Sequence, residues 1–321
     1  MKIKALVAIF LAVIMCLCVI ACQPIDSGNT DSGTNNGGSN NNPGDNQNNQ
    51  QGNNDSSNDN KDDETPAEHG EMKMKFLKLG KSPCVIIRTE NHTIVIDAAA
   101  EDQGSDIVEY LTEKKITTVD YLIITNFSKT CIGGVPALLR EKSITVKNIL
   151  EPDYVKDSNA YTSYRNAVAA VALTAQKIQD NATITVDDVE IKFLCPQKDY
   201  GSMADENDEG NSVVLSITHG SVKFLYTSRI AGDRVTEVIT QISGNKYNLI
   251  TVPNYGIYDA KYDSLFTATG ATNAVIFAST KNPPEISTTA ALETAKITYL
   301  VTRDGGVEVR SDGTAITQFK Q

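Results

Sequence analysis

Short apolar runs rich in β-branched residues recur along most of the chain, and amphipathic stretches separate many of them. The apolar runs have the length and composition of β-strands, whereas the amphipathic stretches repeat with the period of an α-helix. The pattern predicts a mixed α/β domain whose sheets are covered by helices. We expect strands at 74–79, 84–89, 93–98, 120–125, 189–194, 212–217, 222–227, 248–253, 274–279 and 297–302, helices at 105–115, 134–142, 161–178, 233–242 and 291–296, and a closing hairpin at 303–317.

The first 22 residues are of a different kind. Lys2 and Lys4 precede an unbroken apolar run that ends in the letters VIAC at Cys22. A charged start and an apolar core are typical of a secretory signal peptide, and the ending resembles the lipobox of bacterial lipoproteins. The resemblance implies a signal peptide at 1–21, lipidation of Cys22, and an extracytoplasmic protein anchored to the bacterial cell membrane. The alternative is an uncleaved transmembrane anchor, because the run is close to the length that spans a bilayer.

Residues 22–70 are rich in Asn, Gly, Ser and Asp and contain no aromatic residue. Such a segment cannot bury enough apolar surface to offset the entropy lost on ordering, so we predict a disordered tether that leads to a domain at 71–321. The tether holds nine acidic residues against one lysine and carries most of the net charge of −11. The domain is therefore only mildly acidic, which argues against broad nucleic-acid binding.

The domain contains three cysteines, Cys84, Cys131 and Cys195. Their number is odd and their spacing does not match a zinc site. We expect small apolar core residues, and a bridge between Cys84 and Cys131 stays open as an alternative.

Four stretches of the domain, taken together, resemble the metallo-β-lactamase fold and in particular its ComEC-type branch. Residues 74–100 resemble the opening hairpin, and 116–139 resemble the strand, metal-binding loop and Gly-Gly helix start. Residues 210–229 resemble the paired strands before the metal-bridging Asp, and 248–256 resemble the strand that precedes the last His. The resemblance implies a four-layer αββα sandwich of two mixed sheets flanked by helices, with a metal site at one sheet edge.

Enzymes of that family hold one or two zinc ions with His and Asp and activate a water for hydrolysis. The matching positions of this chain carry other residues: Asn126, Ser128, Thr130 and Cys131 in the loop, Arg229 for the bridging Asp, and Asn254 followed by Tyr255 for the last His. Only Cys131 is a good zinc ligand, and Arg229 would place a fixed cation where the metals lie. We therefore expect a degenerate site without zinc or another cofactor.

Asp97 is the position of this set that still matches the family. We expect it to lie beneath the loop and to form a buried ion pair with Arg229, because buried charges are normally paired.

Two other sets of polar residues have plainer interpretations. The three histidines, His69, His92 and His219, lie in the tether, in a hairpin turn and at a strand end, so we expect them at the surface. The acidic run 205–211 partly resembles a calcium loop but lacks the closing Glu, so we expect a solvated loop.

The sequence favours a non-catalytic binding or scaffold protein tethered to the membrane. Its pocket would be lined by Asn126, Ser128, Lys129, Thr130 and Arg229, and would suit a small anionic ligand or a protein partner. The alternative is a ComEC-like hydrolase, a nuclease or phosphodiesterase, with an unrecognised site. A structural protein without a small ligand is the third interpretation, since fold alone does not determine function.

Overall fold

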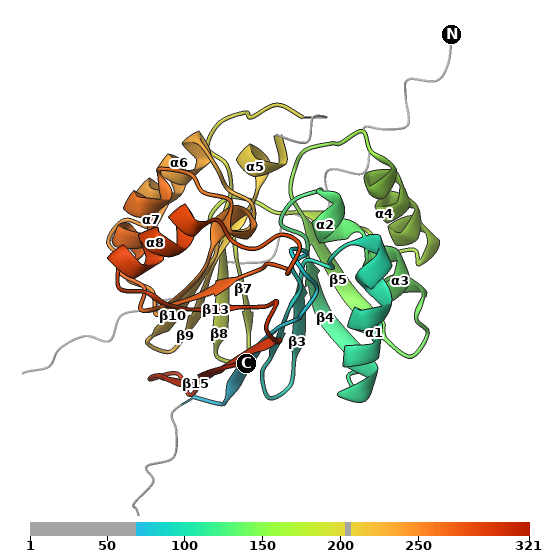
Figure 1. Cartoon of the computed structure of the whole chain (residues 1–321). Coiled ribbons are helices and arrows are strands. Elements are labelled where there is room, and N and C mark those ends of the chain that lie inside the picture. The colour runs from blue at the N-terminus through green and yellow to red at the C-terminus, as the bar shows by residue number, and fades with distance from the viewer. Residues whose placement is uncertain (1–68, 203–206) are drawn as a thin grey trace, which may run out of the picture. The chain divides into compact units, whose positions relative to one another are not determined.

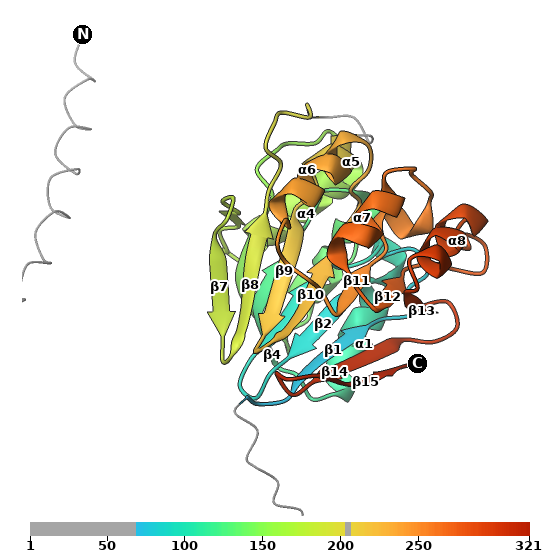
Figure 2. The same cartoon turned by 90° about the vertical axis from the view of Figure 1, so that its left-hand side faces the viewer.

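The computed structural model describes residues 69–202 and 207–321. The expected signal peptide, Cys22 and nearly all of the tether lie outside these residues. Two mixed β-sheets pack face to face, and helices cover the outer face of each (Figures 1 and 2). The predicted sandwich of two mixed sheets flanked by helices is confirmed. No helix in the described ranges is long and apolar enough to cross a membrane.

The first sheet has eight strands in the order β15-β14-β1-β2-β3-β4-β5-β6. Its central strands are parallel from β3 to β6, because helical crossovers connect them. Its strands are β1 (Met72–Phe76), β2 (Val85–Arg88), β3 (Thr93–Ile96), β4 (Thr118–Ile123), β5 (Thr145–Glu151), β6 (Gln176–Lys177), β14 (Val307–Ser311) and β15 (Ile316–Lys320).

The second sheet has seven strands in the order β13-β12-β11-β10-β9-β8-β7. Strands β10 to β13 are parallel, and β7 to β10 form antiparallel hairpins. Its strands are β7 (Thr183–Val186), β8 (Val189–Leu194), β9 (Val214–His219), β10 (Val222–Tyr226), β11 (Leu249–Thr251), β12 (Asn273–Ile276) and β13 (Thr298–Val301).

Three apolar clusters hold the layers together. One lies between the two sheets and includes Phe76, Phe224 and Phe277. The second lies between the first sheet and its helices, and the third between the second sheet and its helices. Because the central strands face an apolar layer on both sides, β3 and β11 are buried at every position.

The helices divide between the two outer faces (Figure 1). Those beside the first sheet are η1 (Glu101–Gln103), α1 (Gly104–Glu113), α2 (Lys129–Ile132), α3 (Val135–Arg140) and α4 (Asn159–Ala170). Those beside the second sheet are α5 (Asn207–Asn211), α6 (Asp233–Gln241), η2 (Pro253–Gly256), α7 (Tyr262–Thr269) and α8 (Ile286–Thr294).

Several elements differ from the sequence prediction. The helix expected at 161–178 is α4, which ends at Ala170, because Ala172 takes a left-handed backbone conformation with φ of 54°. Strand β5 was not expected, since Lys147 and Asn148 interrupt its apolar pattern. The acidic run at 205–211 contains α5 rather than only a loop.

The hairpin of β9 and β10 gives the sandwich two distinct ends. His219 pairs with Val222 at one end, and Leu215 pairs with Tyr226 at the other. We call the end beyond Tyr226 the pocket end, where the chain leaves β3, β4, β10 and β11. We call the other the turn end, where the β7–β8, β9–β10 and β14–β15 turns lie.

Candidate functional site

The carboxyl ends of four strands meet at the pocket end. Asp97 follows β3 and Thr125 lies just beyond β4 in the first sheet, while Ser228 lies beyond β10 and Asn254 beyond β11 in the second. Parallel strands bring their carboxyl ends to the same edge, which is where α/β folds commonly bind ligands. Backbone and side-chain bonds join the two sides, because Asn254 N donates to Ser228 O at 3.2 Å and Thr125 Oγ1 lies 2.7 Å from Ser228 Oγ.

Unusual backbone conformations concentrate in these loops. Five non-glycine residues of the site have positive φ angles, namely Asp97 (56°), Ala99 (54°), Ser228 (54°), Asn254 (46°) and Tyr255 (60°). Such conformations cost free energy and persist only where the surrounding structure enforces them. The loops are therefore held in fixed shapes by their surroundings.

The glycine pair of the loop has a steric function. A Cβ atom on Gly134 would lie 2.2 Å from Ala98 O, and one on Gly133 would lie 2.4 Å from Glu101 N. Both glycines therefore allow the start of α3 to pack directly on the chain that follows β3. This contact fixes Asp97 and the 125–131 loop relative to each other, through bonds such as Ala98 N to Cys131 O at 2.7 Å.

Asp97 is fully buried and is held by hydrogen bonds rather than by a cation. Thr125 donates to it through its backbone N at 2.9 Å and through Oγ1 at 2.7 Å, and the Tyr226 hydroxyl donates at 2.6 Å. Burial raises the pKa of Asp97 to about 6, and the bonds from Tyr226 and Thr125 oppose that rise. The expected ion pair with Arg229 is wrong, because the ion-pair partners of Arg229 are Asp208 and Glu209.

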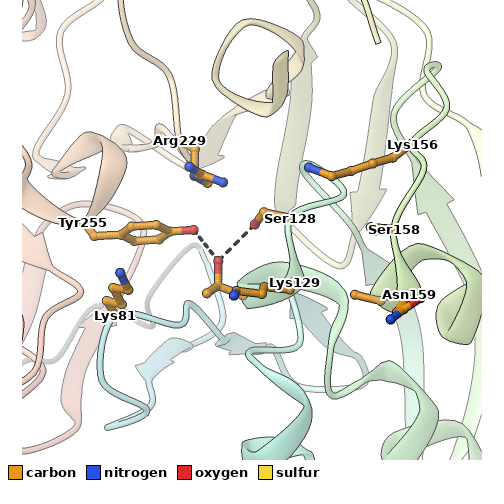
Figure 3. Close-up of a pocket in the computed structure, with 10 residues that line it drawn as sticks. Lys81, Ser128, Lys129, Lys156, Ser158, Asn159, Arg229 and Tyr255 are labelled. Carbon is orange, nitrogen blue, oxygen red and sulfur yellow. Dashed lines mark hydrogen bonds between the residues drawn. The ribbon is translucent and has the colours of Figure 1, made fainter. Parts of the chain in front are cut away.

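The loop positions that the resemblance assigns to metal ligands form a hydrogen-bonded network. Asn126 donates from Nδ2 to Ser228 Oγ at 2.9 Å and accepts from Ser128 N at 2.9 Å. Ser128 Oγ lies 3.0 Å from Thr130 Oγ1, which lies 2.6 Å from the Tyr255 hydroxyl. Figure 3 shows the last two bonds converging between Ser128 and Tyr255. The polar atoms of this network thus satisfy one another directly.

Cys131 lies beneath the network and is fully buried. Burial raises the pKa of its thiol far above the usual range, and its Sγ lies 3.9 Å from the Tyr255 hydroxyl. Cys84, Cys131 and Cys195 are all free thiols, so the alternative of a Cys84–Cys131 bridge does not hold.

Arg229 is fixed by charge and by an aromatic ring. Its guanidinium lies 3.5 Å from Asp208 Oδ2 and 3.6 Å from Glu209 Oε1, and it lies over the Tyr255 ring at 5.5 Å. Asn254 Nδ2 donates to Glu209 at 3.0 Å from the other side. The Nε of Arg229 and the Oδ1 of Asn254 are buried without a hydrogen-bond partner in the described residues.

Asp208 is a second buried carboxylate of the site, and it corrects the expectation of a solvated acidic loop. It is fully buried in α5 and pairs with the buried Lys156 as well as with Arg229. The Tyr154 hydroxyl donates to it at 2.6 Å and accepts from Phe127 N at 2.6 Å. Asp208 is therefore connected to the 125–131 loop through Tyr154, and its carboxylate pairs with two cations.

These residues border a hollow of about 350 Å³ at the pocket end. In Figure 3 the cationic side chains of Lys81, Lys129, Lys156 and Arg229 surround the hydroxyl groups of Ser128 and Tyr255. Lys81 and Lys129 are exposed, and no carboxylate of the described residues forms an ion pair with either. The remaining lining residues are Thr130, Ser158, Asn159 and Ala160.

The histidines lie elsewhere, and one of them contradicts the expectation of a surface position. His219 is fully buried at the turn end, where its ring contacts Asp188 and Ser311. Within residues 69–202 and 207–321, one group of three His, Cys, Asp or Glu side chains has ligand atoms close enough for a metal ion, and it consists of His69, Asp188 and His219. None of these three borders the pocket.

Known structures share this architecture. Neither a protein-family profile nor a curated protein sequence matches the chain. The metallo-β-lactamase fold protein YhfI from Bacillus subtilis superimposes with a TM-score of 0.50 at 13% identity, over 75% of this chain and 100% of that one. Tm1679, described as a metal-dependent hydrolase of the β-lactamase superfamily, gives 0.52 at 9% identity, over 74% and 98%. The chain therefore has the metallo-β-lactamase fold.

Sequence reasoning missed several residues of the site. Lys81 lies within the stretch matched to the opening hairpin, but nothing in that match assigned it to the site. Lys156 lies outside the matched stretches, and Asp208 and Glu209 lie in the run that we expected to be solvated. Ser228, which connects the two loops, stands directly before the matched Arg229. The acidic residues of 205–211 stand out in the sequence, but only the packing of α5 shows that the carboxylate of Asp208 is buried.

Proposed function

We propose that this protein is a non-catalytic, extracytoplasmic lipoprotein that binds a small anionic ligand at the pocket end of its metallo-β-lactamase fold. Lipidation at Cys22 would anchor it to the bacterial cell membrane, and residues 23–70 would serve as the tether. We place the fold in the ComEC-type branch and infer that its metal site is degenerate. A phosphorylated or polycarboxylate ligand fits this chemistry best.

The charge balance of the pocket carries the proposal. Four cationic side chains line the hollow. Within the described residues, Asp208 pairs with Lys156 and Arg229, and Glu209 pairs with Arg229. The other two cations, Lys81 and Lys129, are exposed and have no carboxylate partner in the described ranges. An anion that enters would therefore meet positive charge without breaking an existing ion pair.

The hydroxyl groups would orient the ligand. Burial holds the pKa of Tyr255 well above its usual value, so its hydroxyl stays protonated and can donate. Ser128 and Thr130 are linked to Tyr255 in one chain of hydrogen bonds, which keeps the three hydroxyls in fixed positions. Arg229 is held over the Tyr255 ring and does not need to be ordered when a ligand binds.

The donor set at this site does not fit a zinc ion. The positions matched to metal ligands carry amide and hydroxyl groups that are bonded to one another, and the thiol of Cys131 is buried and protonated. The carboxylate of Asp208 already pairs with Lys156 and Arg229, and the positive charge of Arg229 opposes binding of a metal cation. We therefore assign no chemical step to a metal at the pocket.

Binding of inorganic pyrophosphate to the full chain in detergent would test the proposal by calorimetry. We expect the Lys81→Ala/Lys129→Ala variant to bind about 10-fold more weakly, since each exposed cation contributes about 0.5–1 kcal/mol. Lys142→Ala is the matched control, because Lys142 is an exposed lysine that does not line the pocket. Failure of phosphate, pyrophosphate and citrate to bind would overturn the proposal.

The hydrolase alternative makes a different prediction. A ComEC-like nuclease or phosphodiesterase would turn over its substrate and would hold metal at the pocket. Turnover by the purified chain, together with metal content that falls in Cys131→Ser, would favour the enzyme.

The anchor has a separate test. Cys22→Ala should release the protein from membranes or leave an unprocessed precursor. Normal lipid labelling of that variant would contradict the lipoprotein assignment.

A further inference from the structure

Two histidines and an aspartate converge at the turn end, on the opposite side of the sandwich from the pocket. His69 Nδ1 lies 3.2 Å from Asp188 Oδ2, and His219 Nε2 lies 3.2 Å from the same oxygen. The three ligand atoms all lie within 4.8 Å of one another. His219 is fully buried, while His69 and Asp188 are about one quarter exposed, so an ion can reach the cluster from solvent.

The distances suit a tetrahedral metal ion. Zinc binds imidazole nitrogen and carboxylate oxygen at about 2.0–2.2 Å, so neighbouring ligand atoms lie roughly 3.3 Å apart around it. The two nitrogen–oxygen separations, 3.2 Å each, are already close to this value, and only the two imidazole rings must move closer to each other. Two imidazoles and one carboxylate, with water as the fourth ligand, form a ligand set that selects zinc over calcium or magnesium.

The surroundings hold the rings in place. His219 Nδ1 lies 3.0 Å from Ser311 Oγ, which fixes the ring with Nε2 toward Asp188. The His69 ring fits against Gly313, where a Cβ atom would lie 2.5 Å from the ring carbon Cδ2. It stands edge-on to the His219 ring with centroids 5.7 Å apart. Gly70 N also donates to Asp188 Oδ2 at 2.9 Å, which orients the carboxylate.

The geometry points to a zinc-binding site formed by His69, Asp188 and His219. The ion would join three separate parts of the fold. His69 precedes β1 of the first sheet, Asp188 lies in the β7–β8 turn, and His219 ends β9 of the second sheet. Zinc there would connect the two sheets and fix the point where residues 1–68 join the domain, which is a structural role.

Zinc titration of the full chain in detergent, after removal of metal with a chelator, tests the site. Dialysis and elemental analysis should find about one zinc per chain in the wild type. Free zinc at about 100 times Kd should raise the melting temperature by roughly 5–10 °C. Both effects should fall to less than about a tenth in His69→Ala and in Asp188→Asn.

His92→Ala is the matched control, because His92 is a partly exposed histidine that pairs with the neighbouring Asp187 at 3.3 Å. It should bind zinc like the wild type. Cobalt in place of zinc should give a visible spectrum without a thiolate charge-transfer band, which separates this site from Cys131 and Cys195. Absence of bound zinc in the wild type, or equal binding in His69→Ala and Asp188→Asn, would overturn the site.

Discussion

The two ends of the β9–β10 hairpin carry opposite chemistry. At the pocket end, Arg229 and three lysines border the hollow, beside the amide of Asn126 and the hydroxyl of Ser128. At the turn end, His69 and His219 share the carboxylate of Asp188. The cationic end would attract anions, whereas the imidazole end would attract a transition metal.

This contrast shows that a fold fixes where loops meet but not what they bind. The pocket end keeps the strained backbones and close glycine contacts that shape the site. Its side chains would nevertheless determine the ligand class, and we propose that they select anions. A search for ligand-binding groups that stops at the pocket end would therefore miss the histidine cluster at the turn end.

The largest expected effect tests whether charge pairing organises the pocket end. Asp208→Asn would leave Lys156 and Arg229 without the buried carboxylate that they share. We expect the free energy of unfolding to fall by about 3–5 kcal/mol, because a buried carboxylate that pairs with both cations is removed. Chemical denaturation at neutral pH would measure it.

Glu209→Gln is the control for that change. Glu209 pairs with Arg229 but is 31% exposed, so its loss should cost less than about 1 kcal/mol. Equal costs for the two variants would mean that burial of Asp208 does not govern the stability of the site.

The next effect concerns Asp97, the other buried carboxylate of the pocket end. The pKa of Asp97 is about 6 in the folded protein, above the ordinary value of 3.8. The folded state therefore holds this proton more tightly than the unfolded chain. The stabilising contribution is present below about pH 4 and is lost as pH rises through about 6, by about 3 kcal/mol in total.

Asp97→Asn should remove this dependence, since the amide does not titrate. Denaturation curves of the wild type and the variant between pH 4 and pH 7 would give the difference. A pH-independent gap between the two proteins would mean that Asp97 ionises normally in the fold.

The sequence predicts the layers of this fold well because the core strands have strong apolar patterns. The runs at 93–98 and 222–227 become the buried strands β3 and β10. Strand β5 could not be predicted, because Lys147 and Asn148 interrupt its apolar pattern, and pairing with β4 and β6 holds it in the sheet. Tertiary context overrides the local signal there.

The pocket was predicted only in part, for a related reason. The resemblance predicted a pocket lined by Asn126, Ser128 and Arg229. Ser128 and Arg229 border the hollow, whereas Asn126 is fully buried and bonds to Ser228. The predicted partner of Arg229, Asp97, was wrong. The actual partner, Asp208, lies in α5, which follows a segment without a matching motif. Local sequence contains no signal for a contact between separate loops unless both loops belong to a known pattern.

A smaller effect tests whether one added carboxylate lets the pocket end bind a metal. Arg229→Asp would place a carboxylate beside Asp208 and Glu209, where like charges raise one pKa and oppose folding. We expect a loss of about 2–3 kcal/mol in the free energy of unfolding. The zinc-dependent rise in melting temperature should be no larger than in the wild type. A larger rise would mean that the pocket end retains enough ligands for a metal.

The smallest effect concerns the hydroxyl chain that would orient an anion. Tyr255→Phe removes the 2.6 Å bond to Thr130 Oγ1 but keeps the ring beneath Arg229. The free energy of unfolding should fall by about 1 kcal/mol, the usual net value of one hydrogen bond, because Thr130 keeps its contact with Ser128. Zinc binding at the turn end should not change, since Tyr255 lies across the sandwich from His219. Affinity for pyrophosphate should fall by about 5-fold if the hydroxyl donates to the ligand. An unchanged affinity together with lower stability would mean that Tyr255 supports the pocket through its ring and its bond to Thr130, and that the cations alone hold the anion.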